Sequence, residues 1–131
     1  MDSERLQRFD LFADLSEEMQ TNLAGTANEW SANKGDTLIQ GGGTAEQLFA
    51  IEEGTVEVCG RDGDVVATVG SGEVVGEVGV LKRGLRKTSV QVAEDSKGFF
   101  LISAQVEMLR REDPGFEERL TKLMESRGYS D

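Results

Sequence analysis

Residues 70–90 gather the side chains best suited to bind an anion. Gly76 and Gly79 remove side chains from a short turn, so backbone N–H groups can approach a ligand together. The residues after Glu77 can form one helical turn whose positive end faces the same place. Four of the fourteen basic residues, in a chain of net charge −11, lie within six positions: Lys82, Arg83, Arg86 and Lys87. The stretch therefore predicts an anion site.

Glu77 and Arg86 together suit a sugar phosphate. A carboxylate only accepts hydrogen bonds, as ribose hydroxyls require, and a guanidinium offers a planar fork that matches phosphate oxygens. The alternative interpretation is an exposed hairpin tip, in which Glu77 favours a helix start and the basic side chains are solvated. Glycine pattern and charge alone leave both interpretations open.

The stretch resembles the phosphate-binding cassette of the cyclic-nucleotide-binding domain family, which includes bacterial catabolite activators and regulatory subunits of cyclic-AMP-dependent kinase. That cassette has an apolar residue, Gly-Glu, a small apolar run, an Arg about ten positions on, and hydroxyl residues before a Val-rich strand. The corresponding residues here are Val75, Gly76-Glu77, Val78-Gly79-Val80-Leu81, Arg86 and Thr88-Ser89-Val90. The resemblance extends from about Phe9 to Arg127, but only the cassette is specific.

The resemblance implies a role for each cassette residue. Arg86 is expected to bind the cyclic phosphate, Glu77 and the Gly76 carbonyl to bind the ribose 2′-hydroxyl, and N–H groups near Gly79 and Lys87 to complete the phosphate cradle. Spacing before the arginine varies by one residue in the family, so Lys87 competes with Arg86 for the phosphate; Arg86 is favoured because it restores the step into the next strand. The expected ligand-binding residues are Val75, Gly76, Glu77, Val78, Gly79, Arg86, Lys87 and Thr88.

Composition restricts the chemistry. With no histidine, Ser-His-Asp and Cys-His nucleophiles and histidine metal sites are excluded. A sequence pI near 4.5 argues against nucleic acid or an anionic membrane as a partner. One cysteine, Cys59, and no secretory signal or long apolar run indicate a cytoplasmic protein. We expect no catalytic residue, metal or cofactor.

Short strands separated by glycine-rich turns predict a mainly β fold, a jelly roll (double-stranded β-helix) with N-terminal and C-terminal helices. We expect one domain over 1–131, with a helical entry at 2–29, a β-roll at 30–102 and C-terminal helices at 103–128. Within the roll, separate strands are expected at 48–51 and 55–58, around a tight turn at Glu53-Gly54, and at 90–92 and 99–102.

Helix signals stand at both ends of the chain. Ser16, Ser103 and Asp113 are predicted N-caps, and Pro114 follows the last of them at the first helical position. The final helix presents one apolar face that includes Leu123, Met124 and Arg127. The resemblance makes these three residues candidates for a lid over the bound base. Packing of this face on the roll, or on a second copy in a homodimer, is the structural alternative.

The leading hypothesis is a stand-alone regulatory module that binds a 3′,5′-cyclic nucleotide, cyclic AMP ahead of cyclic GMP, and signals to an unidentified effector protein. The alternative is a protein-interaction domain on the same fold that no longer binds nucleotide. An enzyme is disfavoured by the missing histidines.

Overall fold

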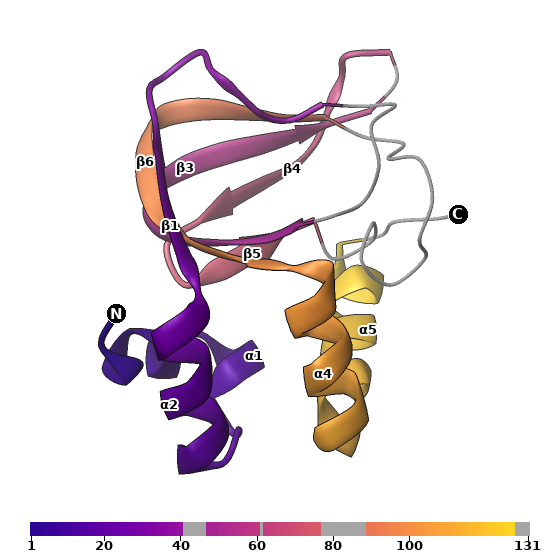
Figure 1. Cartoon of the computed structure of the whole chain (residues 1–131). Coiled ribbons are helices and arrows are strands. Elements are labelled where there is room, and N and C mark those ends of the chain that lie inside the picture. Colours follow the sequence, from indigo (N-terminus) through magenta and orange to yellow (C-terminus); the bar gives the residue numbers. More distant parts are fainter. Residues whose placement is uncertain (41–46, 61, 77–88, 128–131) are drawn as a thin grey trace.

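The computed structural model describes residues 1–40, 47–60, 62–76 and 89–127. It is mainly antiparallel β-sheet with helices at both ends of the chain, as predicted, and the helices lie on one side of the strands (Figure 1). The helical elements are η1 (Ser3–Arg8), α1 (Asp10–Ala13), α2 (Glu17–Thr26), α4 (Ser103–Glu112) and α5 (Pro114–Ser126). The strands, together called the β-roll, are β1 (Asn28–Ala32), β2 (Thr37–Ile39), β3 (Gln47–Cys59), β4 (Val65–Gly70), β5 (Glu73–Val75) and β6 (Ser89–Ile102).

Two long strands organise the β-roll. The strand order is β1-β6-β3-β4, with β2 also paired to β6 and β5 also paired to β3. Each long strand changes partners along its length: β3 pairs with β5 over 49–51 and with β4 over 55–59, while β6 pairs with β2 at its start and with β1 over 96–100. The two long strands therefore pair with each other and, between them, with β1, β2, β4 and β5.

The prediction of separate short strands was wrong at both places. Gly54 does not end a strand; it has φ 105°, and the β3–β6 register shifts around it while pairing continues. The buried hydroxyl of Ser96 accepts a hydrogen bond from the Thr55 N–H at 3.1 Å and donates to the Glu94 carbonyl at 2.7 Å. Because this hydroxyl supplies the missing partners, the bent strands stay in one ladder.

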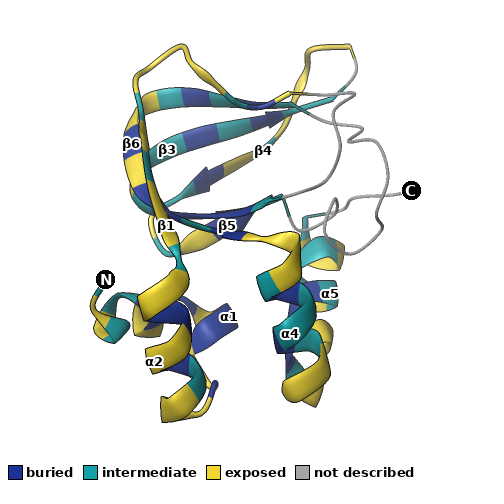
Figure 2. Cartoon of the chain, in the orientation of Figure 1, coloured by how far each residue is buried: buried dark blue, intermediate teal, exposed yellow. Residues whose placement is uncertain are grey.

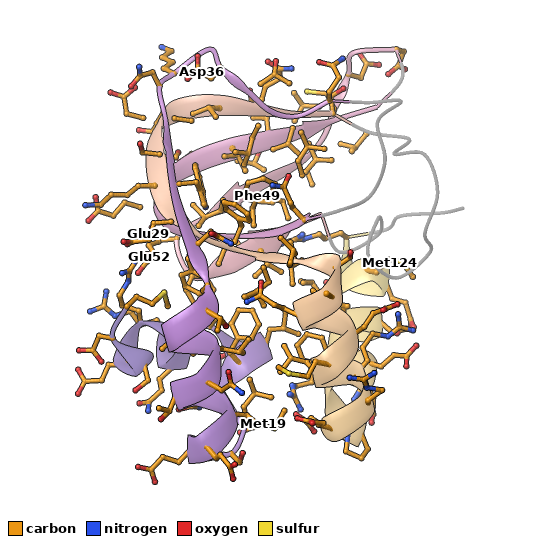
Figure 3. All side chains as sticks on the ribbon, viewed as in Figure 1. Met19, Glu29, Asp36, Phe49, Glu52 and Met124 are labelled. Atoms are coloured by element: carbon orange, nitrogen blue, oxygen red, sulfur yellow. The ribbon has the colours of Figure 1, made fainter. Side chains whose placement is uncertain are left out.

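The long strands are buried on both faces where they pass between the two cores. On β3, Leu48 and Ala50 face the helices, and Phe49 and Ile51 face the inside of the roll, where Figure 3 shows Phe49. This two-sided burial explains why the sequence there is continuously apolar rather than alternating. The helical core consists of Leu6, Phe9, Leu11, Phe12, Leu15, Leu23, Ala24, Leu48, Ala50, Val74, Phe99, Leu101, Val106, Leu109, Phe116 and Leu120. The roll core consists of Ile39, Phe49, Ile51, Val56, Val58, Val69, Val75, Val90 and Val92.

Helix caps mostly follow the predictions. The Ser16 hydroxyl accepts from the Met19 N–H at 3.2 Å, and Asp113 Oδ1 accepts from the Gly115 N–H at 3.1 Å. Ser103 is not a cap, because it is already the first residue of α4. Instead the Gln105 side chain reaches back and accepts from the N–H of Ile102 at 2.9 Å. Apart from its buried stripe, α2 presents mainly exposed residues (Figure 2).

One arginine fixes the N-terminal helices to the roll. Arg5 Nε donates to Glu52 Oε2 at 2.8 Å, and its Nη2 lies 2.7 Å from Glu29 Oε1 and also donates to Glu52 Oε1. Figure 3 shows both glutamates together at the edge of the roll beside η1. The Glu52 side chain is only 11% exposed. The hydrogen bond with Glu52 raises the pKa of Arg5 above its ordinary value, so the charged pair holds η1 against β1 and β3.

We expect Gly98→Ala to destabilise the fold by about 2 kcal/mol or more, because an added Cβ would lie 1.9 Å from the Ala50 carbonyl oxygen and force apart β3 and β6. Gly25→Ala is the matched control: a Cβ there meets nothing within 4 Å, and alanine favours a helix interior by about 0.5–1 kcal/mol. Urea unfolding should therefore shift in opposite directions for the two variants. Equal shifts would contradict the close approach.

Arg5→Met should cost about 2 kcal/mol of unfolding free energy, because the mostly buried Glu52 side chain would lose its hydrogen-bonded partner. The double variant Arg5→Met/Glu52→Met should recover part of that loss. The control is Lys122→Met, whose partner Glu118 and own side chain are 68% and 72% exposed, and we expect a change below about 0.5 kcal/mol. A double-mutant cycle in urea with no coupling between Arg5 and Glu52 would refute the clamp.

Candidate functional site

The strands on either side of the predicted cassette, β5 and β6, both pair with β3. Before it, Val75 on β5 pairs with Phe49 of β3; after it, Ser89 on β6 pairs with Cys59 at the far end of β3. The side chains of Val75 and Val90 both belong to the roll core. The described chain on both sides of residues 77–88 is therefore anchored in the roll core.

Val75 and Gly76 are the described members of the predicted ligand-binding set. The Val75 side chain is fully buried among other valines, so it can offer a ligand only its backbone. Gly76 has φ 98°, a conformation that a residue with a Cβ rarely adopts. A glycine is therefore the residue that suits the position directly after β5.

The other predicted ligand-binding residues lie outside the described residues. They are Glu77, Val78, Gly79, Arg86, Lys87 and Thr88. Their roles, including the choice between Arg86 and Lys87 for the phosphate, stay predictions.

The end of α5 lies beside the start of the cassette. Arg127, the residue that ends α5, has a side chain only 7% exposed, and its Nη2 is 3.7 Å from Glu73 Oε2 on β5. The other carboxylate oxygen of Glu73 accepts from the Gly70 N–H at 3.1 Å. The last turn of α5 is therefore attached to the strand that runs into Gly76.

The three lid candidates have different surroundings. Leu123 packs against the helical core, which supports a structural role for that side chain. Met124 is partly buried at the end of α5 nearest the roll (Figure 3). Sequence reasoning singled out Arg127 but missed its partner Glu73, because no local pattern links β5 to a helix some fifty residues later.

A separate hollow of about 630 Å³ lies between η1 and the outer face of the roll. Its three cationic and three acidic side chains balance, and Arg5 with Glu29 and Glu52, and Lys97 with Glu53, are already paired. The lining is Arg5, Arg8, Glu29, Trp30, Ser31, Glu52, Glu53, Lys97 and Gly98. This balance gives the hollow no preference for an anion.

The described part of the chain contains neither a metal-binding cluster nor a helix that could span a membrane. No group of three or more Cys, Asp or Glu side chains there is arranged to hold a metal ion. No helix in the same ranges has the length and apolar character needed to cross a membrane.

The fold and sequence both match known proteins. The structure superposes on a putative cyclic nucleotide-binding protein from Geobacter metallireducens with a TM-score of 0.85 at 19% identity, covering 98% of this chain and 99% of that one. It superposes on cAMP-bound PfPKA-R with a TM-score of 0.78 at 20% identity, covering 98% of this chain and 46% of that one. Both likenesses concern the fold and confirm the predicted jelly roll.

In sequence, the chain is 29% identical over 104 residues to the cGMP-dependent protein kinase egl-4 of Caenorhabditis elegans. The match covers 79% of this chain but only 13% of that kinase. The pattern of the cyclic nucleotide-binding domain matches residues 29–113. The chain belongs to the cyclic nucleotide-binding domain family.

Proposed function

We propose that this domain binds a 3′,5′-cyclic nucleotide on residues 75–88 and acts as a regulatory module. The observation that carries the proposal is the presence of Gly76-Glu77 and Arg86 in the order of the family cassette. The relatives support the ligand class, since one is a cGMP-dependent kinase and another is a cAMP-bound protein. The two ends of the segment, fixed on the roll core, support a binding place at the roll.

Each polar group has a chemical task in this proposal. Arg86 binds the cyclic phosphate through its planar fork, with Lys87 as the alternative cation. Glu77, an acceptor only, binds the ribose 2′-hydroxyl together with the Gly76 carbonyl. The positive φ and missing side chain of Gly76 support this role, because backbone groups there can approach the ligand without a side chain between them.

Met124 and Arg127 are the proposed lid residues over the base. Their place at the end of α5, with Arg127 against Glu73, supports contact with a ligand held beside β5. Leu123 holds this end of α5 in place by packing on the helical core. We propose cyclic AMP as the preferred nucleotide on the resemblance, with cyclic GMP as the competitor.

The module is proposed to regulate a partner in the cytoplasm rather than to catalyse a reaction. Binding would favour one arrangement of the terminal helices, by as much as the ligand prefers that arrangement. The partner is an unidentified effector protein or a second copy bound through the C-terminal helix.

Arg86→Ala should weaken cyclic AMP binding by about 2–3 kcal/mol, or roughly a hundredfold, because a charge-assisted contact with the phosphate is lost. Arg111→Ala, at an exposed position of α4, is the control and should bind as the wild type does. Calorimetry with cyclic AMP, cyclic GMP and linear AMP measures both effects. No heat and no thermal stabilisation of the wild type by any cyclic nucleotide at millimolar concentration would instead favour the protein-interaction domain.

Glu77→Gln should weaken binding of cyclic AMP but leave that of 2′-deoxy cyclic AMP nearly unchanged, because the deoxy ligand has no hydroxyl for the carboxylate to accept from. Titration of both proteins with both ligands gives the comparison. Equal losses for the two nucleotides would assign Glu77 to the fold instead of the ribose.

A further inference from the structure

We propose that Arg119 is a positioning residue for the nucleotide site, because it braces α5 against α1 and so sets where Met124 and Arg127 meet the roll. This inference rests on the proposed function. It adds a residue eight positions before Arg127, in a part of α5 that contacts α1.

Arg119 makes three contacts at once. Its Nε donates to the carbonyl of Leu11 in α1 at 3.2 Å, and its Nη2 donates to Asp113 Oδ2 at 2.8 Å. Its guanidinium carbon lies 5.9 Å from the centre of the Phe116 ring. Asp113 also caps α5 through the Gly115 N–H. The guanidinium therefore joins the first turn of α5 to α1.

The contacts of Arg119 fix the rotation and height of α5 on α1, which apolar packing alone leaves adjustable. Phe116 and Leu120 are fully buried, and Phe116 stacks on Phe12 of α1 with ring centres 6.3 Å apart. Apolar contacts have no strict direction, so a helix can rotate or slide on them at small cost. Hydrogen bonds from a planar guanidinium have defined directions. Arg119 therefore selects one rotation and one height of α5 on α1.

A small tilt of α5 at Arg119 produces a larger displacement at the end of the helix. At 1.5 Å per residue, Arg127 lies about 12 Å beyond it, so a tilt of about 10° would move Arg127 by about 2 Å. Arg127 contacts Glu73, and β5 leads from Glu73 to Gly76. The contact of Arg119 with α1 thus controls where the lid residues lie against β5, the strand that leads into the binding segment.

The test is a double-mutant cycle on cyclic AMP affinity with Arg119→Met and Met124→Ala, measured by calorimetry. We expect Arg119→Met to weaken binding about tenfold, mainly through faster dissociation, and to have little further effect when Met124→Ala is already present. Arg119→Lys should fall between, because one ammonium cannot bind both Leu11 and Asp113 in the same geometry. Lys122→Met, on the solvent face of α5, is the control and should bind normally.

Thermal unfolding of each unliganded variant accompanies the cycle. If Arg119→Met does not fold, Asp113→Asn takes its place, since asparagine still caps the helix but loses the charge that holds Arg119. Normal affinity in the folded variant, or a loss that adds fully to that of Met124→Ala, overturns the inference while wild-type binding stands. Absence of wild-type binding overturns the proposed function together with it.

Discussion

The structure depends on two long strands that carry apolar side chains on both faces. Where residues 48–51 of β3 pair with residues 98–101 of β6, the two strands separate the helical core from the roll core, so successive side chains face different cores. Phe99 and Phe100 illustrate this: Phe99 contacts Phe9 of the N-terminal segment with ring centres 5.3 Å apart, while Phe100 contacts Phe49 in the roll at 5.4 Å. A change on one side of these two strands therefore acts on a strand that the other side also needs.

Arginines connect the helices to the roll in a chain that is otherwise strongly acidic. Arg5 joins η1 to two strands, Arg119 joins α5 to α1, and Arg127 joins the end of α5 to β5. The chain has 25 acidic and 14 basic residues, and these three partly buried arginines each lie against a carboxylate of the described residues. The helices at both ends of the chain thus pack together around the helical core, and they contact the roll next to the proposed site.

Several features of the fold could be predicted from local sequence patterns. The caps at Ser16 and Asp113 were predictable because a short oxygen side chain before a helical stretch satisfies N–H groups nearby in sequence. The strand breaks around Gly54 and before Phe99 were predicted wrongly, because the continuity of β3 and β6 depends on Ser96, whose hydroxyl completes the ladder from a distant part of the chain. The helix cap by Gln105 was missed because Ser103, a residue type typical of N-caps, stands directly after Ile102, which is the N-cap in the structure.

The sequence by itself determined the fold class, and it predicts a cassette from Val75 to Thr88 and the chemistry that Glu77 and Arg86 can offer, since these depend on residue type and short spacing. Only the tertiary structure decided that Arg127 meets Glu73, that Arg119 reaches Leu11, and that Leu123 packs inward while Met124 lies near the roll. Those contacts join residues from about fifty to more than a hundred positions apart. Their geometry is set by how two cores pack on the same two strands, which no local pattern encodes.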